Sequence, residues 1–159
     1  MSAEEEARVL VIGAGSGGLT VAVGLSRLGR DVVLVEGHHI GGDCTNVGCI
    51  PSKSLLHHSA VYATTEPSTR RGTREILAGV RARRTALRNH EVDEFGSMDG
   101  IDLRFGRARL LGGGRVEVID GADTATVVRA EHIVVATGSS PRRVPIGGIP
   151  AAMIVTNQE

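Results

Sequence analysis

Two cysteines, Cys44 and Cys49, are the only ones in the 159-residue chain, and they lie five positions apart. Such a pair can have three uses. The thiols can be two buried apolar side chains, which is their ordinary use in a reducing compartment. They can join a zinc site with His57 and His58, although structural zinc usually takes cysteines about two to four residues apart plus two further ligands. They can also form a redox-active disulfide.

A disulfide between these cysteines requires an irregular backbone. Cα atoms at positions i and i+5 of a regular helix lie roughly 8.6 Å apart, whereas a disulfide needs about 4.4–6.8 Å. Gly48 supplies the conformational freedom for a distorted turn, and Pro51 is tolerated in a first helical turn. This arrangement predicts Cys49 at or near a helix amino terminus, where the helix dipole stabilises a thiolate.

Lys53 lies four positions after Cys49 and is the only lysine in the chain, whose other cationic side chains are all arginine. A sequence that uses arginine almost throughout, yet keeps one lysine beside the cysteines, indicates a use for an ammonium group there. The alternative is an ordinary surface residue, and composition does not separate the two.

A second group of residues, Gly13-x-Gly15-x-x-Gly18, follows an apolar run and precedes a helical pattern. In a dinucleotide-binding turn, such glycines allow a tight turn, a close approach of pyrophosphate, and close packing of helix on strand. Glu36 ends the next apolar run, where an acid accepts hydrogen bonds from ribose hydroxyls and disfavours a 2′-phosphate. The motif predicts a bound ADP moiety and does not separate FAD from NAD.

The elements that position these residues form a βαβ unit. Residues 8–12 and 31–36 are typical of parallel strands buried on both faces, and the residues between Leu19 and Leu28 predict a helix closed by Gly29. Further along, we expect a helix from near Cys44 to Tyr62, a loop over 63–72, a helix over 74–95, an antiparallel meander over 101–105, 108–111, 116–119 and 125–129, and a buried strand from 133. The fold class is therefore α/β, a Rossmann-like domain with a parallel central sheet and an antiparallel β-meander.

Composition excludes several function classes. The 18 basic and 18 acidic side chains cancel, so no cationic surplus is available for nucleic acid or an anionic membrane. Three aromatic residues are too few for a base-stacking surface. No apolar run approaches the ~20 residues that cross a bilayer. Residues 1–7 are expected to be an acidic tail unlike a targeting peptide, ahead of a domain over 8–159, which predicts a cytoplasmic protein.

The segment GGDCTNVGCIPSK at residues 41–53 resembles the redox signature of the pyridine nucleotide–disulfide oxidoreductases, which include dihydrolipoamide dehydrogenase, glutathione reductase and mercuric reductase. Residues 136–141 resemble the second flavin-domain motif of this family, and residues 106–108 resemble its adenine-side turn. The resemblance covers nearly the whole chain. Two positions depart from the common pattern: Asp43 stands where many members have threonine, and Thr45 where an apolar residue is common.

The resemblance implies FAD as the cofactor, with the isoalloxazine over a Cys44–Cys49 disulfide. Cys49 is then the flavin-proximal thiol, Cys44 the interchange thiol, and Lys53 a neighbour of flavin N5. Electrons pass from NAD(P)H through FAD to the disulfide and on to the substrate, or in reverse. The residues implied to bind FAD are Gly13, Gly15, Gly18, Glu36, Gly42, Asp43, Lys53, Ala108, Thr137 and Gly138.

The resemblance also implies what to expect beyond these residues. The family's nicotinamide-binding and dimerisation domains do not occur in this sequence, so we expect the amino-terminal portion of a homodimeric reductase acting on a disulfide, dithiol, quinone or soft-metal substrate, with no resident metal. Two alternatives stay open: a non-catalytic FAD- or ADP-binding module, and a thiol redox or metal-binding module without flavin.

Overall fold

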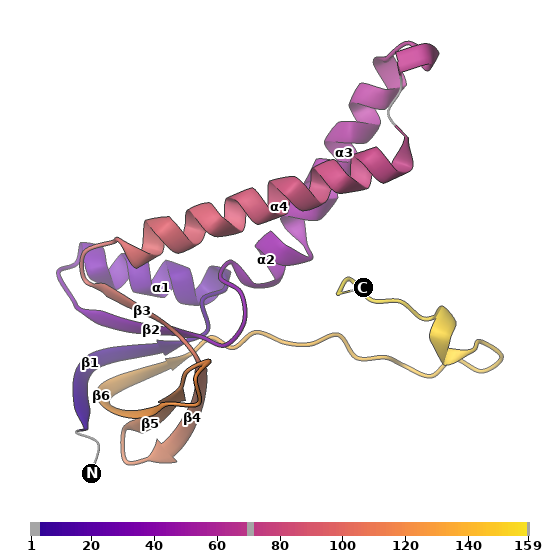
Figure 1. The fold of residues 1–159 in the computed structure, drawn as a ribbon. Coiled ribbons are helices and arrows are strands. Elements are labelled where there is room, and N and C mark those ends of the chain that lie inside the picture. The colour runs from indigo at the N-terminus through magenta and orange to yellow at the C-terminus, as the bar shows by residue number, and fades with distance from the viewer. Residues whose placement is uncertain (1–3, 70–71, 159) are drawn as a thin grey trace.

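The computed structural model describes residues 4–69 and 72–158, which form one mixed sheet with helices packed on it (Figure 1). Residues 1–3 of the expected acidic tail lie outside this range. In chain order, the elements are β1 (Glu5–Ile12), α1 (Ser16–Arg27), β2 (Val32–Glu36), α2 (Gly42–Asn46), α3 (Cys49–Thr64), the 3-10 turn η1 (Pro67–Thr69), α4 (Thr73–Gly96), β3 (Ile101–Phe105), β4 (Arg107–Gly112), β5 (Arg115–Ile119), β6 (Ala125–Val135) and the 3-10 turn η2 (Ala151–Met153).

The sheet has the strand order β3-β2-β1-β6-β5-β4. Strands β3, β2, β1 and β6 pair in parallel, whereas β6, β5 and β4 pair antiparallel. The predicted α/β class, with a parallel centre and an antiparallel extension, is confirmed. The carboxyl ends of the parallel strands β1 and β2 lead directly into the glycine turn and the cysteine segment, so both reach the same edge of the sheet.

Two strand predictions were wrong in detail. Residues 101–105 were expected in the antiparallel meander, but β3 pairs in parallel with β2 at the edge of the sheet. Its alternation of apolar and polar residues suits an edge strand as well as a hairpin, and local pattern does not reveal the partner. Residues 125–129 and 133–135 were expected as separate strands, yet β6 is continuous because residues 125–129 pair with β5 and residues 128–135 pair with β1.

The acidic segment at the amino terminus is shorter than predicted. Strand β1 begins at Glu5, so residues 5–7, expected in the tail, pair with β6. The Glu5 carboxylate also forms an ion pair with Arg104 of β3, at an Nη1–Oε2 distance of 2.7 Å. The strand thus extends three residues toward the amino terminus beyond its apolar run.

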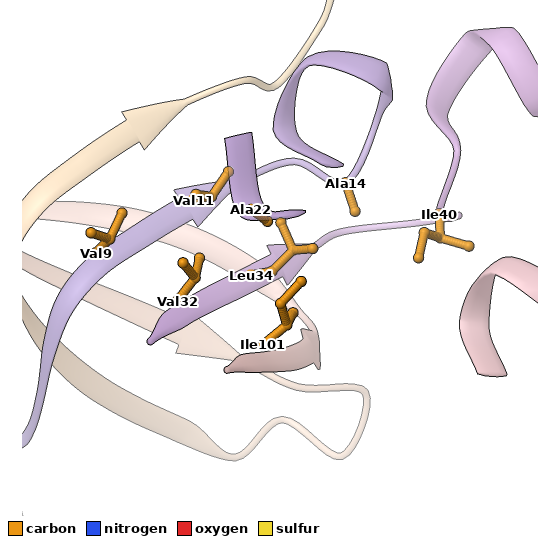
Figure 2. Close-up of a cluster of buried hydrophobic side chains, with 8 residues drawn as sticks. All are labelled: Val9, Val11, Ala14, Ala22, Val32, Leu34, Ile40 and Ile101. Atoms are coloured by element: carbon orange, nitrogen blue, oxygen red, sulfur yellow. The ribbon is translucent and has the colours of Figure 1, made fainter. Parts of the chain in front are cut away.

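The core lies on both faces of the parallel strands because successive side chains of a strand point to opposite faces. Val9 and Val11 of β1 pack toward Ala22 of α1 and Leu34 of β2 in the cluster drawn in Figure 2. Leu10 of β1 points the other way, into a second cluster with residues of β5 and β6. The two clusters hold β1 and β2, and so anchor the turn that follows each strand.

Helices α3 and α4 form a long hairpin that extends away from the sheet (Figure 1). Val80 is buried and Val92 packs against the core, as the predicted apolar stripe of residues 74–95 requires. Leu77 of the same stripe is 39% exposed, because the outer part of the hairpin has no sheet beneath it. Among the described residues, no helix is both long and apolar enough to cross a membrane.

Candidate functional site

The glycine turn joins β1 to α1 through close backbone contacts. Gly13 has a φ of +101°, and a Cβ there would overlap the carbonyl oxygen of Ala136. A Cβ on Gly18 would overlap the Gly13 carbonyl oxygen. The first and third glycines of the predicted motif therefore allow the turn to pack against Ala136, which directly follows β6, and the helix to pack against the turn.

The amino terminus of α1 directly follows the glycine turn, and its backbone N–H groups have no side-chain cap among the described residues. Gly15 is the N-cap residue, no side chain caps the helix, and no acidic residue lies in its first turn. The first N–H groups of a helix lack partners within it, and the helix dipole favours an anion there. This end of α1 fits a pyrophosphate group.

Glu36 lies at the carboxyl end of β2 and is only 9% exposed. Its carboxylate accepts hydrogen bonds from the backbone N–H groups of Ala14 and His38, each at 2.7 Å. A carboxylate offers about four acceptor positions, so capacity remains for ribose hydroxyls. The two bonds also tie the end of β2 to the glycine turn.

The cysteine segment is broken between its two thiols. Helix α2 ends at Asn46, Gly48 has φ −118° and ψ −105°, and α3 begins at Cys49. A Cβ on Gly48 would lie 2.9 Å from the Asp43 carbonyl oxygen. The prediction of an irregular turn, with Cys49 at a helix amino terminus, is confirmed. The single helix expected from near Cys44 to Tyr62 is wrong, because Gly48 divides it into two helices, and α3 continues to Thr64.

The two thiols lie next to each other, and both are free in this structure. Cys44 is half-buried and Cys49 is exposed. The pKa of the Cys44 thiol is raised above its ordinary value by a hydrogen bond with the Cys49 side chain, and further by burial and charge repulsion from Cys49. A hydrogen bond with the Ser16 side chain acts in the opposite direction. The disulfide itself stays a prediction, since the structure holds the dithiol.

Backbone contacts join the glycine turn to the cysteine segment. The Gly41 N–H donates to the Ala14 carbonyl at 2.8 Å, and Gly15 and Gly41 form an isolated parallel bridge. Gly42 has a φ of +55°, and a Cβ there would lie 2.9 Å from the Gly15 Cα. The phosphate-binding turn and the thiol pair are therefore built into one unit.

Together, these segments border a cleft of about 700 Å³. This volume is within the range of ligand sites, about 300–1,000 Å³. The predicted site residues that line it are Gly13, Gly15, Glu36, Gly42, Asp43, Cys44, Thr137 and Gly138. Sequence reasoning did not select the further lining residues Ser16, His38, His39, Asn46, Ser139 and Ser140. Their proximity to the glycine turn or the predicted motifs is the signal that could have found them.

Four predicted residues do not line the cleft. Gly18 lies under the turn, and Cys49 lies beside Cys44. Lys53 is exposed on α3. Ala108 of β4 packs against the second core cluster, although the neighbouring Gly106 N–H donates to the Glu36 carbonyl at 2.9 Å.

The zinc alternative finds no support in the described part of the chain, which contains no group of three or more histidine, cysteine or acidic side chains able to hold a metal ion. His57 and His58 contact each other edge to face on α3, with ring centroids 5.8 Å apart. They do not form a ligand set with the cysteines.

Comparison with known proteins places these features in context. Residues 7–158 match the family described as pyridine nucleotide-disulphide oxidoreductase. Dihydrolipoyl dehydrogenase from Staphylococcus aureus is 35% identical over 154 residues, which cover 88% of this chain and 31% of that protein. Dihydrolipoyl dehydrogenase 3 from Pseudomonas aeruginosa is 36% identical over 157 residues, which cover 89% and 32%.

The structure of the chain is also similar to a solved structure of a flavoprotein disulfide reductase. The Cu(II) complex of the HOCl-induced flavoprotein disulfide reductase RclA from Escherichia coli matches with a TM-score of 0.77 and 27% identity, over 91% of this chain and 31% of that one. The chain thus spans about a third of the length of these relatives. The family match includes the glycine turn and the cysteine segment that border the cleft, and the chain belongs to the FAD-dependent family of pyridine nucleotide-disulphide oxidoreductases.

Proposed function

We propose that this chain is the FAD-binding and redox-thiol portion of a flavoprotein disulfide reductase. The observation that carries the proposal is that backbone contacts join the glycine turn to the cysteine segment at one cleft. The helix terminus suited to pyrophosphate begins at Ser16, and the Cys44 thiol lies within hydrogen-bond reach of the side chain of that same residue. A dinucleotide held by the turn would therefore lie beside the thiol pair.

The residues of the cleft have separate tasks in this proposal. The backbone N–H groups at the start of α1 hold the pyrophosphate, and Glu36 accepts hydrogen bonds from ribose. Thr137 and Gly138 border the cleft from the end of β6. When bound, FAD supplies a two-electron carrier next to the thiols. The assignments of Lys53 and Ala108 to the flavin rest on the resemblance alone, because neither lines the cleft.

The thiol pair exchanges electrons with substrate by thiol–disulfide exchange. One thiolate attacks a substrate sulfur and forms a mixed disulfide, and the substrate's other sulfur leaves as a thiol after taking up a proton. The second cysteine then attacks the first, so the Cys44–Cys49 bond forms and the remaining substrate thiol is released. The resemblance makes Cys44 the interchange thiol, whereas Cys49 is the more exposed of the two. Partial alkylation of the dithiol followed by peptide mapping decides which one reacts first.

The substrate class in the proposal is a small disulfide, a dithiol or a soft metal ion, with NAD(P)H as the electron partner of the whole protein. Named relatives include dihydrolipoyl dehydrogenases and a disulfide reductase captured as a Cu(II) complex. Paired thiols suit both disulfide exchange and the binding of soft metal ions. A homodimeric whole protein and a cytoplasmic location belong to the same proposal.

Two titrations of the purified chain test the proposal. Added FAD is expected to bind the wild type, with a saturable change in its fluorescence. The affinity of Glu36→Ala for FAD is expected to be about tenfold lower, because the substitution removes one charge-assisted hydrogen-bond acceptor. Incubation with glutathione disulfide is expected to block both cysteines from alkylation, and dithiothreitol to restore both. A chain that binds no FAD, or whose cysteines stay alkylatable in glutathione disulfide, contradicts the proposal.

A further inference from the structure

The short helix α2, which carries Cys44, packs against α4. Helix α2 lies beside α4 (Figure 1), and consecutive residues of α2 have different surroundings. Cys44 lines the cleft, whereas Thr45 is 4% exposed and directs its hydroxyl to α4. The Thr45 hydroxyl donates to Oε1 of Glu91 at 2.9 Å.

A second contact from α4 reaches the other end of α2. The Arg84 Nη1 group donates to the carbonyl oxygen of Asn46 at 3.4 Å. The Asn46 side chain in turn donates to the carbonyl oxygens of Ile40 and Gly42, each at 2.9 Å. The residue that Arg84 contacts thus also ties the two ends of α2 together.

Glu91 and Arg84 contact opposite ends of α2. Arg84 and Glu91 are seven positions apart, which is two turns and about 10.5 Å along a helix. The Glu91 Oε2 atom lies against Gly41, the residue that precedes α2, whereas Arg84 contacts the carbonyl of its last residue. Glu91 thus contacts the start of α2 and Arg84 contacts its end.

Stability of the fold does not explain this arrangement. Oε2 of Glu91 and Nε of Arg84 are both buried and have no hydrogen-bond partner among the residues that the structure describes. Burying charged groups with incomplete partners costs free energy that apolar side chains of similar volume would not cost. A function that depends on the placement of α2 gives a reason to keep both.

We infer that Glu91 and Arg84 are positioning residues that hold α2 so that the Cys44 thiol stays next to Cys49. The inference rests on the proposed function, in which the two cysteines form a reversible disulfide. Fixing α2 raises the effective concentration of one thiol at the other, which favours the disulfide over the dithiol. Loosening α2 shifts the equilibrium toward the dithiol.

The test is the equilibrium constant for oxidation of the chain by glutathione disulfide. The Cys44–Cys49 bond forms, the disulfide of glutathione breaks, and the two thiol protons pass to the two glutathione thiols. Acid quenching, alkylation and mass measurement give the fraction of each form. Glu91→Ala and Thr45→Val are expected to shift the constant about fivefold to tenfold toward the dithiol, since each removes a hydrogen bond to a charged group.

Matched variants separate positioning from general damage. Glu91→Gln keeps an acceptor for Thr45, and Thr45→Ser keeps the donor, so both are expected within about twofold of the wild type. Glu94→Ala removes an exposed carboxylate from the same helix and is expected to change nothing. Far-UV circular dichroism and the unfolding midpoint show whether each variant is folded. If Glu91→Ala does not fold, the comparison of the equilibrium constants of Thr45→Val and Thr45→Ser tests the positioning role instead.

The outcomes also separate the inference from the proposed function. If the wild type forms the disulfide and the folded Glu91→Ala and Thr45→Val variants have the same equilibrium constant, the positioning role is wrong and the proposed function stands. If the wild type forms no disulfide, the proposed function fails and the inference fails with it. A shift in these two variants with none in Glu94→Ala supports both.

Discussion

The cysteine segment and the C-terminal segment, residues 136–158, border the same cleft but are held in different ways. Close backbone contacts with the glycine turn and polar contacts with α4 hold the cysteine segment. Beyond β6, the C-terminal segment extends away from the sheet without a strand or an α-helix (Figure 1). Its Val144, Ile146, Ile149, Met153 and Val155 are all exposed, the last at 75%.

This difference shows which side of the cleft is held most firmly by contacts among the described residues. On the cysteine side, the positions of Gly15, Gly42 and Cys44 follow from contacts that leave little room for movement. On the C-terminal side, the Ala136 N–H bonds to the Ile12 carbonyl at 2.8 Å, and the contacts further along include bonds within the segment, such as that from Arg143 to the Ile154 carbonyl at 2.9 Å. Segments with few buried apolar contacts open at low free-energy cost. We therefore expect the cysteine side to respond strongly to small changes and the C-terminal side weakly.

One added methyl group on each side gives the largest expected contrast. Gly42→Ala forces a Cβ toward the Gly15 Cα at a positive φ, and it is expected to lower the free energy of unfolding by about 1–3 kcal/mol. Gly147 has open space around it, so Gly147→Ala is expected to raise the free energy of unfolding by no more than about 1 kcal/mol. Urea unfolding measures both. Equal effects of the two substitutions would remove the distinction between the two sides.

A smaller effect is expected at the Cys44 thiol. Cys49→Ala removes the largest cause of its raised pKa, so the pKa falls, the thiolate fraction below the pKa rises, and alkylation by iodoacetamide accelerates about threefold to tenfold. Ser16→Ala removes the hydrogen bond that lowers the pKa, so the pH profile moves to higher pH.

The control for the thiol prediction lies on the C-terminal side. Ser140 borders the same cleft, and Ser140→Ala is expected to leave the pH profile of alkylation unchanged. The measurement is the alkylation rate of Cys44 between about pH 6 and 10. A pH profile that moves with Ser140→Ala and not with Ser16→Ala would show that the C-terminal segment, rather than Ser16, affects the pKa of the Cys44 thiol.

Sequence reasoning reached the parts of the site whose causes are local. The glycine turn, Glu36 and the irregular turn before Cys49 each follow from residues within a short stretch of chain. The partner of β3 was missed because an alternating pattern specifies a half-covered strand and not its neighbour. The continuity of β6 was missed because its partner changes along its length.

The contacts behind α2 could not be predicted for a different reason. Thr45 and Glu91 are 46 positions apart, and Asn46 and Arg84 are 38 apart. In the sequence, Arg84 is one of several arginines on a helix and is most simply a solvated residue. The packing of α4 against α2 turns these side chains into partners of the cysteine segment, and no local pattern carries that information.

A flavin held by the glycine turn would lie beside the thiol pair, and this placement can be measured by the absorbance of the FAD-loaded chain during stepwise dithionite reduction. A thiolate in contact with oxidised flavin adds a long-wavelength charge-transfer band. The resemblance makes Cys49 the flavin-proximal thiol, so we expect this band in the wild type and in Cys44→Ser, and expect it to be absent in Cys49→Ser. FAD that binds with the same spectrum in the wild type and in Cys49→Ser would rule out this placement of the flavin.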